Sequence, residues 1–460
     1  MSERPGQTDH LLQSWIDLGE AVERHSEIRR LLFDPVTGLP TTPLLFPRIQ
    51  VLLEERGEVS LLCLNVVRYS KIEEIYGWEV FDDVMRETAQ ALESITGVDL
   101  RDSDIIAELM ISGNSFVVVL SPPRNTLHAA DEALEALCAR VESRIREILG
   151  ERLEPALYRK FGCYVGASKI LRDHSVRLER LVHDGLERAL AASARREADD
   201  GQRRVEALRD IIAAEEVRTL VHPVVRLDDL SVIGYEALSR GPEGGEFERP
   251  DKLFGVAYDA DLVFKLERLC RKKSLETARR LPEERLLFLN IEPEAVSDPE
   301  LREMVFSTLL ADVGMTPERV VLEITERCAI DDFRAFRATL EYLRAIGFPV
   351  AVDDGGAGYG SLQCLAEVRP EWLKIDMSLV RGIDGDEMRE SLVASLAAFC
   401  DRVGVHVVAE GIETEEELAK LRELGVEFGQ GFLFSLPCEP YPEDAAVTAF
   451  RDGGGAGSAA

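Results

Sequence analysis

Long apolar segments are missing from this chain of 460 residues, which has no stretch of about 18 uncharged apolar side chains able to cross a bilayer. The polar start 1–10 also lacks the charged-then-apolar pattern of a secretory signal. Basic residues are scarce, because 54 Lys and Arg stand against 85 Asp and Glu, a formal net charge of −31. Nucleic-acid backbones and anionic membranes repel such a chain, so we expect a cytoplasmic protein with neither as a general partner.

Closely spaced cysteines are missing as well. The eight cysteines are scattered along the chain: Cys63, Cys138, Cys163, Cys270, Cys328, Cys364, Cys400 and Cys438. No two of them have the spacing of zinc ligands, and several lie in apolar segments, so we expect reduced core residues. Any metal site in this protein should therefore use oxygen and nitrogen ligands.

The length predicts two domains, with a helix before them and a tail after them. Within residues 1–33 the apolar side chains fall at helical spacing as far as Asp34-Pro35, where a helix should end. We expect this helix to pack on its own domain; a short dimerising stalk is the alternative. Residues 448–460 are rich in Gly, Ala and Ser, the composition of a flexible tail.

A first domain is predicted over residues 34–195, with the strand, helix, hairpin, helix, strand order of a ferredoxin-like α+β fold. These elements are expected at Val59–Val67, Val80–Ile95, Ile105–Leu109, Phe116–Leu120, Ala129–Ile148 and Phe161–Ala167. A last helix over Leu178–Ala194 leads into residues 196–210, whose dense charge favours a solvated helical linker.

Residues 211–447 alternate strand-like apolar runs with helical segments, which predicts a parallel α/β sheet with crossover helices. The apolar runs keep ending at a residue able to bind metal or move a proton: Glu236, Asn290, Glu323, Asp353, Asp354, Lys374, Glu410 and Gln430. In a barrel of eight parallel strands and helices, catalytic groups lie at the C-terminal strand ends. One acidic residue after a strand is usually a helix cap, but a whole series predicts an active site.

The residue types indicate the chemistry of that site. Carboxylate and amide oxygens are the ligands that Mg²⁺ and Mn²⁺ prefer. Asp353 and Asp354 are adjacent, so one carboxylate could bridge two ions about 3.5–4 Å apart, an arrangement used in phosphoryl displacement. Lys374 would bring a cation into this acidic site and orient the attacking water. The pattern therefore predicts hydrolysis of a phosphate ester.

These motifs resemble the EAL family, phosphodiesterases that hydrolyse the bacterial second messenger cyclic di-GMP. The matching segments follow the family's order: Glu236-Ala237-Leu238 with Arg240, Asn290-Ile291-Glu292-Pro293, Glu323-Ile324-Thr325-Glu326, Asp353-Asp354, Lys374-Ile375-Asp376, Ala409-Glu410-Gly411-Ile412-Glu413-Thr414 and Gln430-Gly431. The resemblance implies a (β/α)8 barrel of the triosephosphate-isomerase type, two Mg²⁺ or Mn²⁺ ions, cleavage to linear pGpG and a homodimer formed through this domain. The alternative is a non-hydrolytic cyclic di-GMP receptor, although such receptors usually lose metal-site carboxylates and none is missing here.

The same resemblance implies a role for each site residue. The metal ligands are Glu236, Asn290, Glu323, Asp353 and Asp354. The catalytic residues are Lys374, Glu410 and Glu236, and the substrate-binding residues are Arg240, Gln430, Glu413 and Leu238, of which Glu413 is similar to the family's loop-anchoring glutamate. The sequence departs from the family pattern in two places, the loop after the aspartates, which affects regulation in the family, and one strand. Gly355 and Gly360 replace larger residues in the loop after the aspartates, and His222 replaces a usual glutamine, where we expect a tolerated strand residue and not a metal ligand.

The first domain is similar to GGDEF, or diguanylate cyclase, domains, starting with Asp34-Pro35-Val36-Thr37-Gly38-Leu39-Pro40. Asn65 stands where that family has an acidic metal ligand, and the signature hairpin is Ser112-Gly113-Asn114-Ser115-Phe116. Without carboxylates the two metal ions of nucleotidyl transfer cannot be held, so we expect a degenerate, regulatory or dimer-supporting domain. Arg101-Asp102-Ser103-Asp104 has the form of that family's inhibitory nucleotide site; we expect a solvated loop there, with guanine nucleotide binding as the alternative.

Overall fold

The computed structural model describes residues 32–67, 77–109, 113–121, 130–158, 161–292, 298, 305–325, 333–355, 361–439 and 441. The chain divides into two compact units, Met1–Arg203 and Arg204–Ala460. The helix expected before residue 32 and the tail expected over 448–460 lie outside the described residues. No helix in the described ranges has the length and apolarity needed to span a bilayer.

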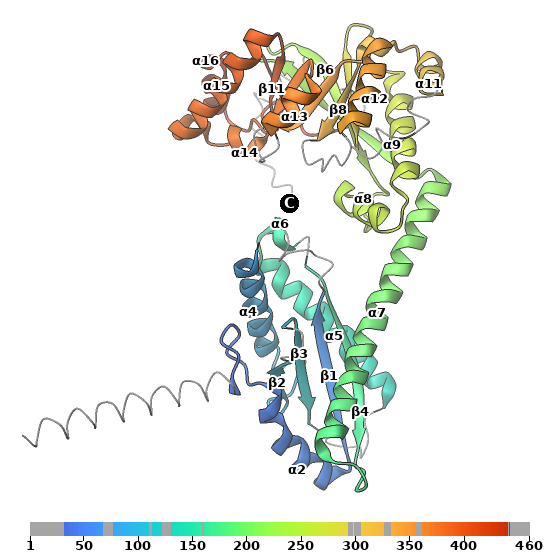
Figure 1. Ribbon diagram of the computed structural model, residues 1–460, viewed down its shortest axis with the longest axis vertical. Helices are drawn as coiled ribbons and strands as arrows, with labels where there is room; N and C mark the ends of the chain where they lie inside the picture. Colours follow the sequence, from blue (N-terminus) through green and yellow to red (C-terminus); the bar gives the residue numbers. More distant parts are fainter. Residues whose placement is uncertain are drawn as a thin grey trace, which may run out of the picture. The chain divides into compact units, whose positions relative to one another are not determined.

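Unit 1 contains a four-stranded antiparallel sheet with strand order β2-β3-β1-β4 (Figure 1). Its strands are β1 (Glu58–Val66), β2 (Ile105–Glu108), β3 (Ser115–Leu120) and β4 (Cys163–Leu171). Its helices are α2 (Phe46–Arg56), α4 (Trp78–Ser94), α5 (Asp131–Arg152), the short α6 (Pro155–Tyr158) and α7 (Leu178–Ala214), with a 3-10 turn at Thr42–Leu45. This is the ferredoxin-like order that the sequence predicts.

Strand β1 is buried on both faces because helices cover each side of the sheet. Leu62 and Leu64 belong to a core with α4 and α5, whereas Leu61 and Cys63 belong to a second core with α2 and α7. The alternation follows the two-residue period of a strand. It also explains why β1 is a continuous apolar run in the sequence.

Helix α7 is longer than expected. It runs without a break from Leu178 to Ala214 and so includes the predicted linker 196–210. Gly201 lies inside it, where an added Cβ would meet no atom within 4 Å. The linker is therefore a continuation of the last helix of unit 1, and it crosses the boundary between the units.

Unit 2 is built on a closed eight-stranded barrel in the order β10-β11-β12-β5-β6-β7-β8-β9. Its strands are β5 (Arg218–Arg226), β6 (Val232–Arg240), β7 (Leu286–Ile291), β8 (Val320–Thr325), β9 (Val350–Gly355), β10 (Trp372–Ile375), β11 (His406–Ala409) and β12 (Phe428–Gly429). The helices that connect them are α8 (Pro250–Asp259), α9 (Val263–Ala278), α11 (Val305–Val313), α12 (Phe333–Ala345), α13 (Ser361–Val368), α14 (Met377–Val380), α15 (Glu387–Val403) and α16 (Glu415–Glu423) (Figure 1).

One strand departs from an all-parallel barrel. Strands β6 to β12 pair in parallel, but β5 pairs antiparallel with both of its neighbours, β6 and β12. The reason is the short connection between β5 and β6, in which Arg226 N–H donates to the Ser231 carbonyl at 2.8 Å. So short a turn can join only antiparallel strands, because a parallel pair needs a crossover.

The described cysteines agree with the expected reduced core residues. Five are buried and unpaired: Cys63, Cys138, Cys163, Cys270 and Cys400. Cys438 is a half-buried thiol outside any disulfide. Burial raises the pKa of Cys63 and Cys270 to about 12 in each case, so both remain protonated, unreactive thiols at neutral pH.

Candidate active site

Seven of the predicted site residues form one polar layer inside the barrel, next to an apolar layer. The apolar layer takes one side chain from each of seven strands: Val224, Phe288, Val321, Ala351, Trp372, Val408 and Phe428. Two positions along a strand the side chain points to the same face again. On β7 to β10 those next residues are Asn290, Glu323, Asp353 and Lys374, and directly after the ends of β11 and β12 they are Glu410 and Gln430. The same rule places Glu236 two residues after Gly234 on β6.

Lys374 is the central residue of this polar layer. Its Nζ lies 2.6 Å from Glu410 Oε1 and 3.0 Å from Glu323 Oε1. It also lies 3.4 Å from a carboxylate oxygen of Glu236 and 3.4 Å from one of Asp353. The side chains of Lys374 and Glu323 have 0% exposure. One buried ammonium thus faces carboxylates from four strands or strand ends, an arrangement that is stable only because the charges are paired.

Glu236 is held in place by two side-chain amides. Asn290 Nδ2 donates to Oε1 of Glu236 at 2.9 Å, and Gln430 Nε2 donates to Oε2 at 2.8 Å. Burial opposes ionisation, but the Lys374 charge and these two hydrogen bonds outweigh it and lower the pKa of Glu236 to about 2. Glu236 is therefore ionised at neutral pH, as a carboxylate that binds a cation must be.

The pKa values of the neighbouring carboxyl groups Glu323 and Glu410 shift in the opposite direction, upward. Burial raises the pKa of Glu323 well above its usual range, against the attraction of Lys374 and with the support of the Glu236 charge. Burial also raises the pKa of Glu410 to about 8, again against Lys374. For Lys374 burial opposes the charge, but the surrounding carboxylates outweigh it and raise its pKa. The layer therefore carries more carboxylates than one ammonium can neutralise.

Several oxygens of the layer fit a metal ion. Oε2 of Glu323 and Oε1 of Gln430 are buried without a hydrogen-bond partner, and Oε1 of Glu323 and Oδ1 of Asp353 have only the shared ion pair with Lys374. Buried acceptors left unpaired are destabilising, and a divalent cation would satisfy them while offsetting the surplus negative charge. Among the described residues, no three Asp, Glu, His or Cys side chains already stand together as a ready ligand cluster. Lys374 Nζ lies between the carboxylates.

The remaining predicted residues are placed less centrally. Leu238 and Arg240 lie further along β6, and the Arg240 guanidinium donates to the Ser239 carbonyl at 2.9 Å. Burial lowers the pKa of Arg240, against the attraction of Glu236. Asp354 is part of β9, but its side chain lies outside the described part of the structure, as do residues 356–360 of the glycine-rich loop.

Glu413, the predicted loop-anchoring residue, forms an ion pair with Arg381 in which both side chains are exposed. The anchoring contacts come from Glu417, which sequence reasoning missed. Its carboxylate accepts the backbone N–H groups of Gly382 at 2.8 Å, Glu413 at 2.8 Å and Thr414 at 3.1 Å. The sequence signal was the capping box of Thr414 and Glu417 at the start of α16.

In unit 1, neutral groups occupy the positions where a cyclase needs carboxylates. Asn65 at the end of β1 pairs with Ser115 at the start of β3, and Ser115 Oγ donates to Asn65 Oδ1 at 3.1 Å. Asn114 Nδ2 donates to the Val66 carbonyl at 2.9 Å. Arg101 NH1 donates to the Ser121 carbonyl at 2.6 Å, so this guanidinium is engaged with the residue that follows β3.

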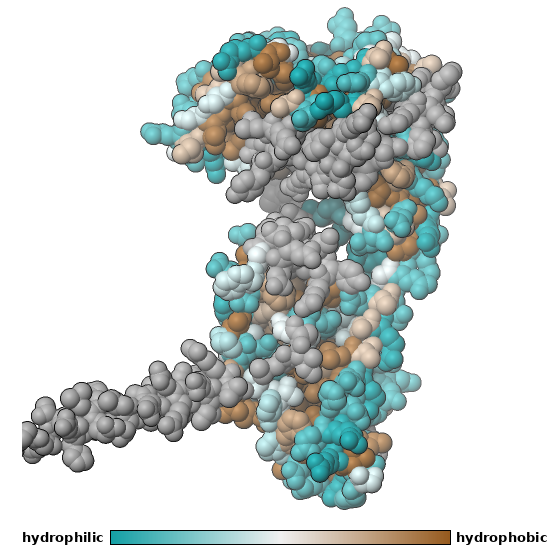
Figure 2. All heavy atoms as spheres, in the orientation of Figure 1, coloured by the Kyte–Doolittle hydropathy of each residue, from teal (hydrophilic) through white to brown (hydrophobic). Residues whose placement is uncertain are grey.

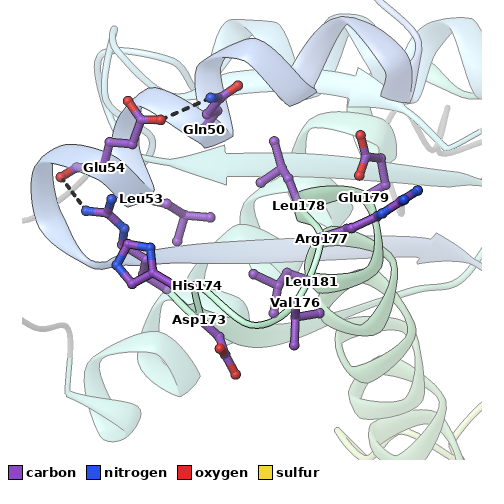
Figure 3. Close-up of a pocket in the computed structure, with 11 residues that line it drawn as sticks. Gln50, Leu53, Glu54, Asp173, His174, Val176, Arg177, Leu178, Glu179 and Leu181 are labelled. Carbon is purple, nitrogen blue, oxygen red and sulfur yellow. Dashed lines mark hydrogen bonds between the residues drawn. The ribbon is translucent and has the colours of Figure 1, made fainter.

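A pocket of about 570 Å³ in unit 1 contains none of the predicted site residues (Figure 3). It lies between α2 and the segment that leads into α7, and its lining mixes both charges, with Arg172 and Arg177 beside Glu54 and Asp173. Arg172 NH1 donates to the Glu54 carbonyl at 3.2 Å. This open, mixed surface lacks the convergent, buried groups that mark the barrel layer.

The fold and the polar layer together define an α/β barrel protein with a charged site at the carboxyl ends of its strands. The chain belongs to the EAL domain family, whose pattern it matches over residues 205–437. Residues 31–187 match the family described as diguanylate cyclase, GGDEF domain. A GGDEF domain is therefore followed by an EAL domain, as the sequence motifs predict.

Known relatives share one or both domains. The chain is 32% identical over 227 residues to the cyclic di-GMP phosphodiesterase RocR of Pseudomonas aeruginosa, covering 48% of this chain and 57% of RocR. It is 26% identical over 432 residues to the bifunctional diguanylate cyclase/cyclic di-GMP phosphodiesterase MucR of the same organism, covering 89% of this chain and 61% of MucR. A standalone EAL protein from Vibrio cholerae O395, solved with cyclic di-GMP bound, is 29% identical, covering 49% of this chain and 94% of that chain with a TM-score of 0.45. The chain spans about half the length of the first curated relatives that it matches, 49% and 53%.

Proposed function

We propose that the EAL domain hydrolyses cyclic di-GMP to linear pGpG with the help of Mg²⁺ or Mn²⁺. The observation that carries the proposal is the buried layer in which Lys374 Nζ lies within 3.4 Å of four carboxylates. Stability alone gives no reason for this surplus of buried negative charge. The relatives RocR and MucR, whose names include cyclic di-GMP phosphodiesterase, support the same substrate.

The residues that would hold two ions are Glu236, Asn290, Glu323, Asp353 and Asp354. When bound, such ions lower the pKa of a coordinated water and offset the charge that develops on the phosphate. Within the protein, Asn290 and Gln430 fix the Glu236 carboxylate in one orientation. Lys374 donates toward the anionic phosphate oxygens and the attacking water.

Proton transfer falls to Glu410 in this proposal, because burial raises its pKa to about 8, near the pH at which a general base must work, while Lys374 Nζ at 2.6 Å favours its ionised form. The water oxygen bonds to phosphorus and the bond from phosphorus to the ribose 3′ oxygen breaks. One proton of the water passes to Glu410, and the departing 3′ oxygen takes up a proton from the solvent or from Lys374. Arg240, Gln430, Glu413 and Leu238 are proposed to hold the substrate.

The test is an assay of the purified chain with Mn²⁺, in which pGpG is separated from cyclic di-GMP by chromatography. Hydrolysis is expected, and intact cyclic di-GMP under conditions that permit dimers would refute the proposal. The alternative, a non-hydrolytic receptor, is separated by Glu236→Ala. An enzyme loses turnover in this variant while retaining most ligand binding, whereas a receptor has no turnover to lose.

We also propose that the GGDEF domain makes no cyclic di-GMP. The neutral pair of Asn65 and Ser115 supports this, since their 3.1 Å hydrogen bond occupies the strand ends where carboxylates would hold metal ions. Cyclic di-GMP formed from GTP by the full chain with Glu236→Ala, which blocks product loss, would contradict it. Binding of a guanine nucleotide at Arg101 and Asp104 is the less favoured role, because Asp104 already accepts the N–H groups of Arg101 and Ser121.

We propose that the EAL domain forms a homodimer through α15. This helix exposes four apolar side chains on one face: Met388 at 69%, Leu392 at 45%, Phe399 at 39% and Val403 at 55%. Apolar side chains also gather at the surface in the region of α14 to α16 (Figure 2). A second copy of the chain would remove this face from water.

A further inference from the structure

His222 belongs to the polar layer, although the sequence alone gives it no role. Because β5 runs antiparallel to its neighbours, the layer residue on β5 comes two positions before Val224 and not two positions after it. That residue is His222, which lies directly opposite Glu236 in the register of β5 and β6. It is 8% exposed.

A chain of hydrogen bonds joins His222 to the centre of the site. His222 Nε2 lies 3.0 Å from the Ser435 carbonyl oxygen, and Nδ1 lies 2.7 Å from Gln430 Nε2. The same Gln430 Nε2 donates to Glu236 Oε2 at 2.8 Å. Each member of this chain therefore has a partner on both sides.

The acceptors at the two ends of this series of hydrogen bonds, the Ser435 carbonyl and the Glu236 carboxylate, determine where its protons lie. A carbonyl oxygen only accepts, so the ring nitrogen that faces Ser435 must carry the proton. A carboxylate only accepts, so the Gln430 atom that faces Glu236 must be the amide nitrogen. In the neutral imidazole Nδ1 is then the acceptor, and it takes the second hydrogen of the Gln430 amide. Burial lowers the pKa of His222, which favours this neutral form.

The orientation of the Gln430 amide follows from this assignment. With its nitrogen held by His222 and Glu236, its Oε1 is left buried and without a hydrogen-bond partner. A turned amide would place Oε1 against the Glu236 carboxylate and the Nδ1 lone pair, which would repel it. His222 thereby presents the Gln430 oxygen as a free acceptor in the layer.

We propose that His222 is a positioning residue, whose Nε2-protonated ring locks the Gln430 amide so that Oε1 faces a bound cation or its water and Glu236 keeps one orientation. The proposal rests on the proposed function only in taking the polar layer as a metal-binding site, because Mn²⁺ affinity and the His222 tautomer can both be measured without turnover. It replaces the expectation of a tolerated strand residue with a defined task.

The first test compares Mn²⁺ affinity of the full chain, measured by calorimetry, in three variants. His222→Phe removes both ring contacts and is expected to weaken Mn²⁺ binding about 10–100-fold, the usual effect of losing a group that orients a metal ligand. His222→Gln retains one donor and one acceptor and is expected to restore affinity close to that of the wild type. His183→Phe, a change at an exposed histidine of unit 1, is the control and should have no effect. Unchanged Mn²⁺ affinity in a folded His222→Phe protein would overturn the proposal.

The second test remains decisive where His222→Phe fails to fold. Nitrogen NMR of the ¹⁵N-histidine-labelled wild-type chain, with the His222 signals identified by their absence in His222→Gln, reports which ring nitrogen carries the proton. The Nε2-protonated tautomer is expected, and the Nδ1-protonated tautomer would overturn the proposal. A wild-type chain that binds Mn²⁺ with the expected His222 dependence but leaves cyclic di-GMP intact would refute the proposed function alone.

Discussion

Lys374 Nζ lies 2.6 Å from Glu410 Oε1, and both side chains belong to the interior of the barrel. Burial raises the pKa of Glu410 to about 8 even beside this ammonium, because Asp353 and Glu236 add their negative charges. Lys374 is thus shared among several carboxylates and cannot neutralise all of them. Without a further cation the carboxylates of the site repel one another, and this repulsion should be measurable in variants of Lys374 and Glu323.

Replacing Lys374 with Met, a side chain of similar length, should destabilise the metal-free protein and abolish hydrolysis. Four carboxylates would then face one another without a cation, and removing one partner of a buried ion pair typically costs about 3–5 kcal/mol. Urea unfolding in the presence of a chelator measures the effect. The matched control is Lys272→Met, whose ion pair with Glu215 is exposed and should contribute little. Equal stability of the two variants would contradict the buried network.

Adding Mn²⁺ should raise the melting temperature of the wild type, and Glu323→Gln should reduce this increase. A ligand that binds only the folded state stabilises it by about 2.7 kcal/mol at 100 times its dissociation constant. In the metal-free protein burial raises the pKa of Glu323 because its ionised form is unfavourable there, and Glu323→Gln removes that unfavourable group, so its melting temperature should equal or exceed that of the wild type. Differential scanning calorimetry with Mn²⁺ or a chelator gives both values.

The exposed Glu416→Gln is the control for this experiment and should keep the wild-type response to Mn²⁺. If Glu323→Gln responded to Mn²⁺ as strongly as the wild type, the Glu323 oxygens would not be ligands.

The sequence locates the residues of the polar layer because their spacing follows the strand period. Apolar runs mark the strands, and the residue just past each run has the parity that points into the barrel, as for Glu323 and Asp353. What the runs do not encode is strand direction. β5 runs antiparallel because the turn before Ser231 is short, and only this direction places His222 opposite Glu236. A reader of the sequence who assumes parallel strands would not pair these two residues.

Other differences have similar causes. The predicted end of the last helix of unit 1 at Ala194 was wrong because charged residues and Gly201 do not stop a helix in the absence of a capping signal. Contacts between distant segments, such as Glu417 with Gly382, depend on tertiary packing that no local pattern reports.

Unit 1 should lose stability as the pH rises toward 8. Burial and the neighbouring Asp34 carboxyl raise the pKa of Glu108 from 4.5 to about 8. A raised folded-state pKa means that the folded domain binds this proton more tightly than the unfolded chain does. Its stabilising effect is therefore complete below pH 4.5 and is lost as the pH rises to about 8. Thermal unfolding of unit 1 at pH values between 4.5 and about 8 measures how steeply its stability falls with pH.

Glu108→Gln keeps a neutral group beside Asp34 and should flatten this dependence on pH. The exposed Glu151→Gln, on α5, is the control and should retain the wild-type slope. A Glu108→Gln protein with the wild-type slope would show that other groups cause the pH dependence.

Breaking the apolar face of α15 should convert the proposed dimer into a monomer. Phe399→Asp places a charge between Leu392 and Val403 on the helix, and burying an unpaired carboxylate in an apolar interface is strongly unfavourable. Size-exclusion chromatography with light scattering reports the mass of each species. Ala398→Glu is the matched control, since this exposed position on the same helix points away from the apolar face. A wild-type monomer at micromolar concentration, or dimers of equal strength in both variants, would exclude α15 as the interface.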